Sequence, residues 1–80
     1  MLRLLLMSAR ITEKRFDAHA GAILVTIEDD LGARSVHTIH VLAPDGSEVD
    51  AAAAIAAALR QADERAARVR AAFSKHGWTP

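Results

Sequence analysis

Histidine is the residue type in this chain best suited to metal binding, and the chain has four of them. His37 and His40 lie three residues apart in a segment rich in β-branched residues, so a strand would point them to opposite faces. His19 falls in a turn, and His76 ends a helical segment, where a protonated imidazole suits the helix dipole. The chain has no cysteine, and no histidine pair has the spacing that places two ligands on one helix face. We therefore predict no metal site.

A serine beside a histidine could support nucleophilic catalysis. Ser35 and His37 share one face of a predicted strand, where their side chains can touch only obliquely, and no glycine-rich oxyanion element lies nearby. Glu28, Asp29 and Asp30 form an acidic cluster, but we expect it at a solvated hairpin tip, whereas acid–base catalysis needs a cleft. Nucleotide-binding and metalloprotease motifs are absent. The sequence predicts no catalytic residue, no cofactor and no enzyme.

Basic residues gather towards the C-terminus, where residues 65–75 carry Arg65, Arg68, Arg70 and Lys75 and no acid. On a helix, Arg65 and Arg70 flank an apolar stripe from opposite sides. Arg68 and Lys75 point away from that stripe, so the positive charge is splayed. The chain has no net charge, and its two Phe and one Trp are too few for a base-stacking platform. Nucleic-acid binding through this basic region is therefore the alternative function and not the favoured one.

Three segments with the composition of strands must position these side chains, and we predict an antiparallel sheet over residues 9–43. The strands are expected at residues 9–17, 22–28 and 34–42. The first strand alternates imperfectly, because Ile11 and Phe16 have opposite parity. Either a bulge lies between these two residues or only one of them faces the core.

The turn between the second and third strands determines their register. Residues 29–32 (Asp-Asp-Leu-Gly) predict a type I turn followed by a glycine of positive φ, which makes a three-residue hairpin loop. Paired residue numbers then sum to 62, so that Val25 faces His37 and Glu28 faces Arg34. The residues that share the expected core face are Ile23, Val25, Ile27, Ile39 and Val41.

One long helix is predicted over residues 47–76. Ser47, with an aspartate three residues later, has the pattern of a capping box, and alanines dominate the first half. Gly77 suits the left-handed residue after a helix, and Trp78 would then contact Phe73 in a Schellman cap. The sequence thus predicts an α+β fold in β-β-β-α order, with a three-stranded antiparallel sheet packed against one long C-terminal helix.

The length of 80 residues predicts a single small domain over residues 1–80. Residues 1–8 are either an upstream extension or an edge strand, because their apolar run is too short for a signal peptide or a membrane span. A chain of this size buries only about 60% of its unfolded surface. Without disulfides, we expect it to depend on oligomerisation or on very regular packing.

The helix carries an apolar stripe with the alternating three- and four-residue spacing of a heptad seam. Its members are Ala52, Ile55, Leu59, Ala62, Ala66, Val69 and Phe73. Residues 48–76 as one helix span about 43 Å, whereas an eight-residue strand spans about 26 Å, so the helix should overhang the sheet. A second copy of the helix, the Leu2–Leu6 segment or a different protein would cover the overhang. Alternatively, the stripe is core, and the helix is bent or broken near residues 61–64.

These patterns favour a non-catalytic protein-interaction module, either an adaptor or an inhibitor that occludes a larger partner. We expect the module itself to form a homodimer through its C-terminal helix. The seam expected to make this contact is Ala62, Ala66, Val69 and Phe73, with Arg65 and Arg70 on its flanks. The expected partner is another protein or a second copy, and not a membrane. The absence of cysteine fits a reducing cytoplasm, which is the expected location.

Overall fold

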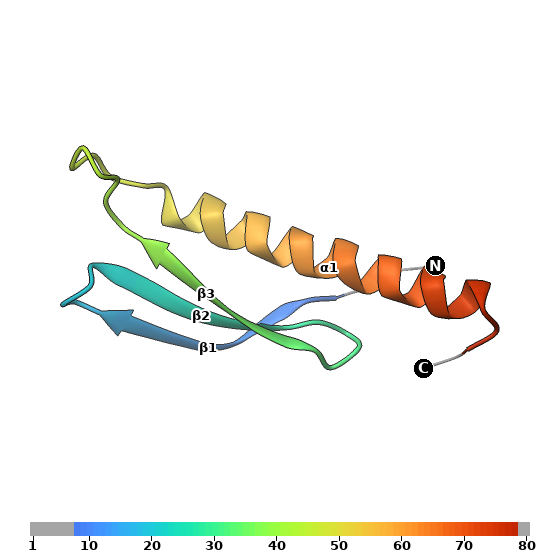
Figure 1. Cartoon of the computed structure of the whole chain (residues 1–80). Coiled ribbons are helices and arrows are strands. Elements are labelled where there is room, and N and C mark those ends of the chain that lie inside the picture. The colour runs from blue at the N-terminus through green and yellow to red at the C-terminus, as the bar shows by residue number, and fades with distance from the viewer. Residues whose placement is uncertain (1–7, 79–80) are drawn as a thin grey trace.

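Three strands and one helix follow one another along residues 8–78, the part of the chain that the computed structural model describes. They are β1 (Arg10–Asp17), β2 (Ala22–Glu28), β3 (Arg34–His40) and α1 (Ala51–Lys75). The strands form one antiparallel sheet in the order β1-β2-β3, and α1 lies across one of its faces (Figure 1). The predicted α+β fold is confirmed. The predictions for residues 1–7, including a cover formed by Leu2–Leu6, lie outside the described residues.

A bulge in β1 places its two large apolar residues, Ile11 and Phe16, on the same face of the sheet. The pairing with β2 shifts between Ile11 and Glu13, so that Ile11 lies opposite Ile27 and Phe16 lies opposite Ile23. Both residues therefore share the face of the sheet on which α1 packs. Because α1 packs mainly on β2 and β3, however, Phe16 remains 78% exposed.

The predicted hairpin and its register are confirmed. Val25 pairs with His37, and Glu28 pairs with Arg34 and forms an ion pair with it. The Gly32 amide donates to the carbonyl of Asp29 at 3.0 Å, and Gly32 has a φ of 87°. Glycine adopts this left-handed conformation without the steric penalty of a side chain, which explains why the loop ends there.

The core is small and lies between β2, β3 and the first half of α1. Its buried residues are Val25, Ile27, Ile39 and Ala58. Full burial of a side chain such as Val25 or Ile27 contributes about 1.5–3 kcal/mol. Alanines on α1 allow the helix to approach the sheet closely, but Ala52, expected on the stripe, is exposed. The face of α1 that packs on the sheet instead includes Ala54 and Ala58. Because alanine occurs on every side of this part of the helix, the sequence pattern does not show clearly which side is buried.

The helix begins later than predicted. Its N-cap is Asp50, whose side chain accepts a hydrogen bond from the amide of Ala53, and not Ser47. Ser47 belongs to the preceding turn, where its amide and its hydroxyl both donate to Oδ1 of Asp45. An isolated antiparallel bridge between Leu42 and Glu48 closes that turn.

The end of the helix is as predicted. The Trp78 amide donates to the carbonyl of Phe73 at 2.7 Å, the Gly77 amide donates to that of Ser74 at 3.1 Å, and Gly77 has a φ of 76°. These bonds define a Schellman cap. The rings of Phe73 and Trp78 meet edge to face, with centroids 6.2 Å apart, so the apolar contact expected of this cap is also present.

The helix runs without interruption through residues 61–64, so it neither breaks there nor ends with the sheet. Its 25 residues span about 38 Å at 1.5 Å each. In Figure 1 the helix continues beyond the loop between β2 and β3. The molecule measures 49 × 23 × 21 Å and has a radius of gyration of 15.4 Å. A compact chain of this length would have a radius of gyration of about 12 Å.

Candidate functional site

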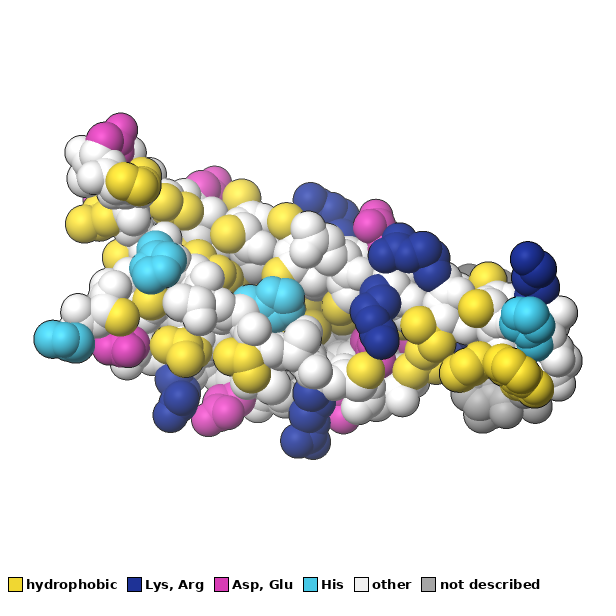
Figure 2. All heavy atoms as spheres, in the orientation of Figure 1, with side chains coloured by type: hydrophobic (Ala, Val, Ile, Leu, Met, Phe, Trp, Pro, Cys, Tyr) yellow, Lys and Arg dark blue, Asp and Glu magenta, His cyan; other side chains and the backbone are white. Residues whose placement is uncertain are grey.

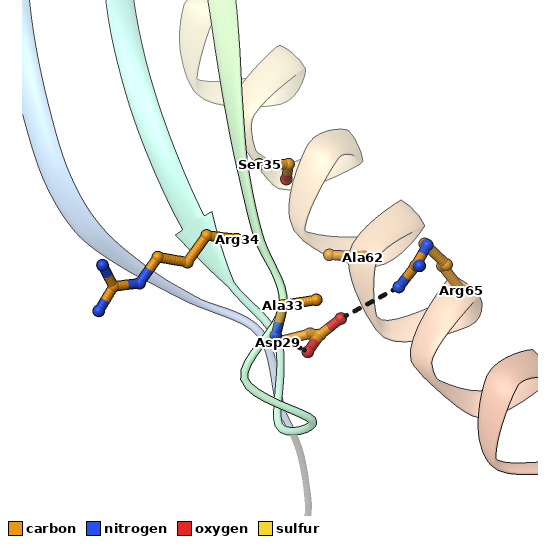
Figure 3. Close-up of a pocket in the computed structure, with 6 residues that line it drawn as sticks. All are labelled: Asp29, Ala33, Arg34, Ser35, Ala62 and Arg65. Atoms are coloured by element: carbon orange, nitrogen blue, oxygen red, sulfur yellow. Dashed lines mark hydrogen bonds and ion pairs between the residues drawn. The ribbon is translucent and has the colours of Figure 1, made fainter.

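The loop between β2 and β3 is exposed at Asp30, Gly32 and Ala33, but its first residue, Asp29, is not solvated as we expected. Asp29 is only 4% exposed. Its Oδ1 accepts hydrogen bonds from the amides of Leu31 at 2.9 Å and Ala33 at 3.0 Å. Its Oδ2 lies 3.7 Å from Nη1 of Arg65 on the helix (Figure 3). Asp29 therefore organises the loop and joins it to α1.

The next residue of the loop makes a second link to the helix. Oδ2 of Asp30 lies 3.0 Å from Nη2 of Arg70. Both arginines that flank the predicted seam are thus paired with acids of the loop. Arg68 and Lys75 form no ion pair within residues 8–78. On the face shown in Figure 2, Lys and Arg side chains occur in separate groups and do not form one continuous patch.

A groove runs between β3 and α1. One part of it, of about 370 Å³, is lined by Ser35, His37, Gln61, Ala62, Arg65 and Arg68. An adjoining part, of about 200 Å³, shares Ser35, Ala62 and Arg65 with the first and extends to Asp29. We call the two parts together the β3–α1 groove. Figure 3 shows Ser35 and Arg65 on its two sides, whereas Arg34 points away from the helix.

Most polar side chains of the β3–α1 groove can donate hydrogen bonds, whereas Asp29, at one end of the groove, adds a carboxylate that only accepts them. Oγ of Ser35 and Nε2 of His37 share a hydrogen bond of 2.9 Å, closer than the oblique contact that we expected. That distance suits a nucleophile and its base. Yet among the described residues no hydrogen bond orients the other ring nitrogen of His37, as a triad would require. Together with Gln61, Arg65 and Arg68, the pair forms a set of groups suited to binding an oxyanion.

The residues of the predicted seam have separate surroundings. Ala62 packs against the core, and Ala66 is only 2% exposed. Val69 is half-buried, and Phe73 lies at the surface beyond it. Trp78 is 61% exposed, and the ring of His76 stacks on it with centroids 5.0 Å apart. The sequence indicated only a capping role for this tryptophan.

The pKa of Asp45 is shifted, and this residue lies outside the groove. The hydroxyl of Ser47 and then its amide donate to the Asp45 carboxylate, and these bonds lower the pKa of Asp45 below its usual value of 3.8. Both groups are exposed, in the turn before α1. This shift reflects the geometry of a turn and does not indicate a site.

Within residues 8–78, no three His, Asp or Glu side chains cluster in a way that could hold a metal ion. No helix in that range has the length and apolar composition that crossing a bilayer requires. No protein-family model matches the chain, and neither the curated proteins nor the solved structures contain a match.

Proposed function

We propose that the chain is a non-catalytic protein-interaction module that pairs with a second copy of itself through the C-terminal part of α1. The observation that carries this proposal is the overhang of the helix beyond the sheet. The apolar side chains on or beside it are Val69, Phe73 and Trp78. Exposed aromatic side chains gathered at one place favour a protein contact, because each can bury about 150–250 Å².

Two features support a second copy as the occupant. The buried core is small for a chain that lacks disulfides, and association through the overhang would add apolar burial. The ion pairs with Asp29 and Asp30 also neutralise Arg65 and Arg70, which lowers the repulsion between two basic helix ends. Of the predicted seam, Val69 and Phe73 are available for this contact, since Ala62 lies against the core and Ala66 is buried.

As a binding module, the chain would serve as an adaptor or as an inhibitor that occludes a larger partner. We place it in the cytoplasm, which the absence of cysteine supports. The isolated Ser35–His37 pair supports a non-catalytic role, because nothing described holds the imidazole in the orientation that a base needs.

Light scattering after gel filtration tests the self-association. We expect twice the chain mass of 8.6 kDa for the wild type and a single chain mass for Val69→Asp. Ala71→Asp is the matched control, because it places the same charge on an exposed position of the same helix and should remain dimeric. Circular dichroism checks that both variants stay helical. A wild-type monomer at high protein concentration would refute the self-association.

The alternative, nucleic-acid binding through the basic part of α1, has less support from the geometry. Two of its four bases are paired with Asp29 and Asp30. Binding that depends on Arg68 and Lys75 should weaken steeply with salt, because each neutralised phosphate releases a counterion. Titration of a labelled oligonucleotide at increasing salt measures this dependence. Absence of binding at low salt removes the alternative.

A further inference from the structure

We propose that the outer edge of β3 and the β3–α1 groove bind an extended acidic segment of a partner protein, which adds to the sheet as a fourth strand. This surface lies along β3 and the middle of α1, whereas the proposed self-association uses the C-terminal end of the helix. The proposal goes beyond that function and does not rest on it.

The hydrogen-bond pattern shows which backbone groups of β3 are open. The Val41 amide donates to the carbonyl of Gly21 at 3.0 Å, and the Asp29 amide donates to the carbonyl of Ala33 at 2.9 Å. In an antiparallel ladder the bonded pairs alternate, so the odd-numbered residues of β3 bond to β2. The even-numbered residues turn their amides and carbonyls outward; they are Arg34, Val36, Thr38 and His40. Within residues 8–78, no strand pairs with this side.

The edge lacks the usual protection against added strands. Natural edge strands are shielded by lysine, proline, a bulge or very short length. β3 is seven residues long, contains no lysine or proline and pairs with β2 without a shift in register. Val36, at its centre, is 65% exposed. The backbone of β3 can therefore accept another strand along its whole length.

The β3–α1 groove supplies a charge that selects the segment. Arg65 and Arg68 lie three residues apart on α1, about 5–6 Å between Cβ atoms. Alternate side chains of an added strand would stand about 6.8 Å apart on the face towards α1. Two carboxylates two residues apart therefore match the two guanidinium groups. The charge of Arg65 is partly neutralised by Asp29, but at 3.7 Å this contact is longer than a strong charge-assisted bond and leaves N–H donors of Arg65 for a ligand. Arg68, which has no ion pair within residues 8–78, supplies the greater part of the charge.

The other side chains of the groove and strand extend the same recognition. Ser35, His37 and Gln61 line the groove and offer further hydrogen bonds to carboxylate oxygens. Residues of the segment that lie between its acids would point to the opposite face of the sheet, beside Val36 and Thr38. The preferred segment is therefore one in which acidic residues alternate with β-branched apolar ones.

Fluorescence anisotropy with a short labelled peptide of alternating Glu and Val tests the charge. We expect it to bind the wild-type protein, and the matching Lys and Val peptide not to bind. Arg68→Glu should weaken binding at least about tenfold, which corresponds to 1.4 kcal/mol. The control Arg60→Glu makes the same charge change about two turns nearer the start of α1, at a residue that does not line the β3–α1 groove, and should change the affinity by less than about twofold. Equal affinity for both peptides, or equal loss in both variants, would overturn the proposal.

Backbone methylation of the peptide tests the strand addition on the unaltered protein. Peptides N-methylated at alternate residues in each of the two phases should differ, because only one phase removes the amides that face β3. Val36→Pro, which removes an outward amide, should also abolish binding while circular dichroism shows an intact fold. Binding that survives methylation in both phases would refute a fourth strand. So would an oligonucleotide that displaces the peptide at equal concentration.

The outcomes also separate this proposal from the proposed self-association. Val69→Asp should leave the affinity for the peptide unchanged, and saturating peptide should leave the mass of the assembly at two chains plus peptide. If instead Val36→Pro converts a wild-type dimer to a monomer, the edge of β3 is filled by a second copy, and the acidic segment is excluded.

Discussion

Replacement of Asp29 probes the contact between the β2–β3 loop and the helix. The change Asp29→Ala removes the acceptor of two backbone amides, those of Leu31 and Ala33. It also removes the partner of Arg65. The amides remain in place with no side-chain acceptor, so the loop loses the bonds that hold its turn.

The expected loss of stability follows from these contacts. A hydrogen bond to a charged acceptor contributes about 1.5–3 kcal/mol. Leu31 is half-buried and Ala33 is exposed, so water replaces part of what the two amides lose. The side chain of Arg65 is 60% exposed, and such an ion pair contributes about 0–1 kcal/mol. We expect Asp29→Ala to lower the free energy of unfolding by about 2–3 kcal/mol. That is a large part of the 4–12 kcal/mol, roughly, available to a chain of this length.

Two matched variants separate the contributions. Asp29→Asn keeps an oxygen acceptor and removes the charge, and Arg65→Ala removes the ion pair alone; each should lower stability by about 1 kcal/mol or less. Urea unfolding followed by far-ultraviolet circular dichroism measures the free energy of unfolding of all three variants. The reasoning is refuted if Asp29→Ala lies within about 0.5 kcal/mol of the wild type, or if Asp29→Asn is as destabilising as Asp29→Ala.

Three further predictions concern the helix start, the core and the turn before the helix. Asp50→Ala should lower the free energy of unfolding by about 0.5–2 kcal/mol because it removes the N-cap, and Ser47→Ala, outside the helix, should lower it less in the same urea titration. Ile27→Val should lower it by about 0.5–1.5 kcal/mol because the side chain is fully buried, whereas denaturation curves of the exposed-site control Val36→Ala should stay within about 0.5 kcal/mol of the wild type. The pKa of Asp45 is lower in the folded chain than its usual value of 3.8, so its carboxylate stabilises the turn above that pH and the contribution disappears as the pH falls through the folded pKa. Carbon-detected NMR titration should place the Asp45 midpoint below 3.8, and Ser47→Ala should raise it.

The parts of the fold that could be predicted depend on contacts between near neighbours in the chain. The β2–β3 register follows from a short loop that needs Gly32 at its end, and a loop of set length determines every pair in the hairpin. The Schellman cap depends on Gly77 and its two apolar neighbours, all within six residues. The start of the helix was predicted wrongly because a second local preference competed for Ser47. The amide and the hydroxyl of Ser47 both donate to Asp45 in the preceding turn, and Asp50 caps the helix instead.

The features of the candidate site depend on contacts between segments far apart in the sequence. Asp29 was expected to be solvated because a hairpin tip usually is, but its carboxylate is buried between two amides of its own loop and Arg65 of α1. The approach of Arg65 to this loop depends on how α1 packs on the sheet, which short sequence patterns do not show. The only sequence signal was the match of two adjacent acids with Arg65 and Arg70. The β3–α1 groove likewise exists because Ala62 is small where the helix passes β3.

The uncovered position of β1 implies that the fold has parts of unequal stability. All eight residues of β1 are exposed. The strand is held at its start, where the Ala9 amide donates to Oδ1 of Asp63 at 2.6 Å and Arg10 pairs with Glu28. Its other end is joined to β2 by a short turn, but the side chain of Phe16 there packs against little. Native-state hydrogen exchange should therefore show the β1 amides opening in a sub-global unfolding that leaves β2, β3 and α1 folded. Each such opening would expose the edge of β2 that β1 covers in the folded sheet, so β2 would become an edge strand only transiently.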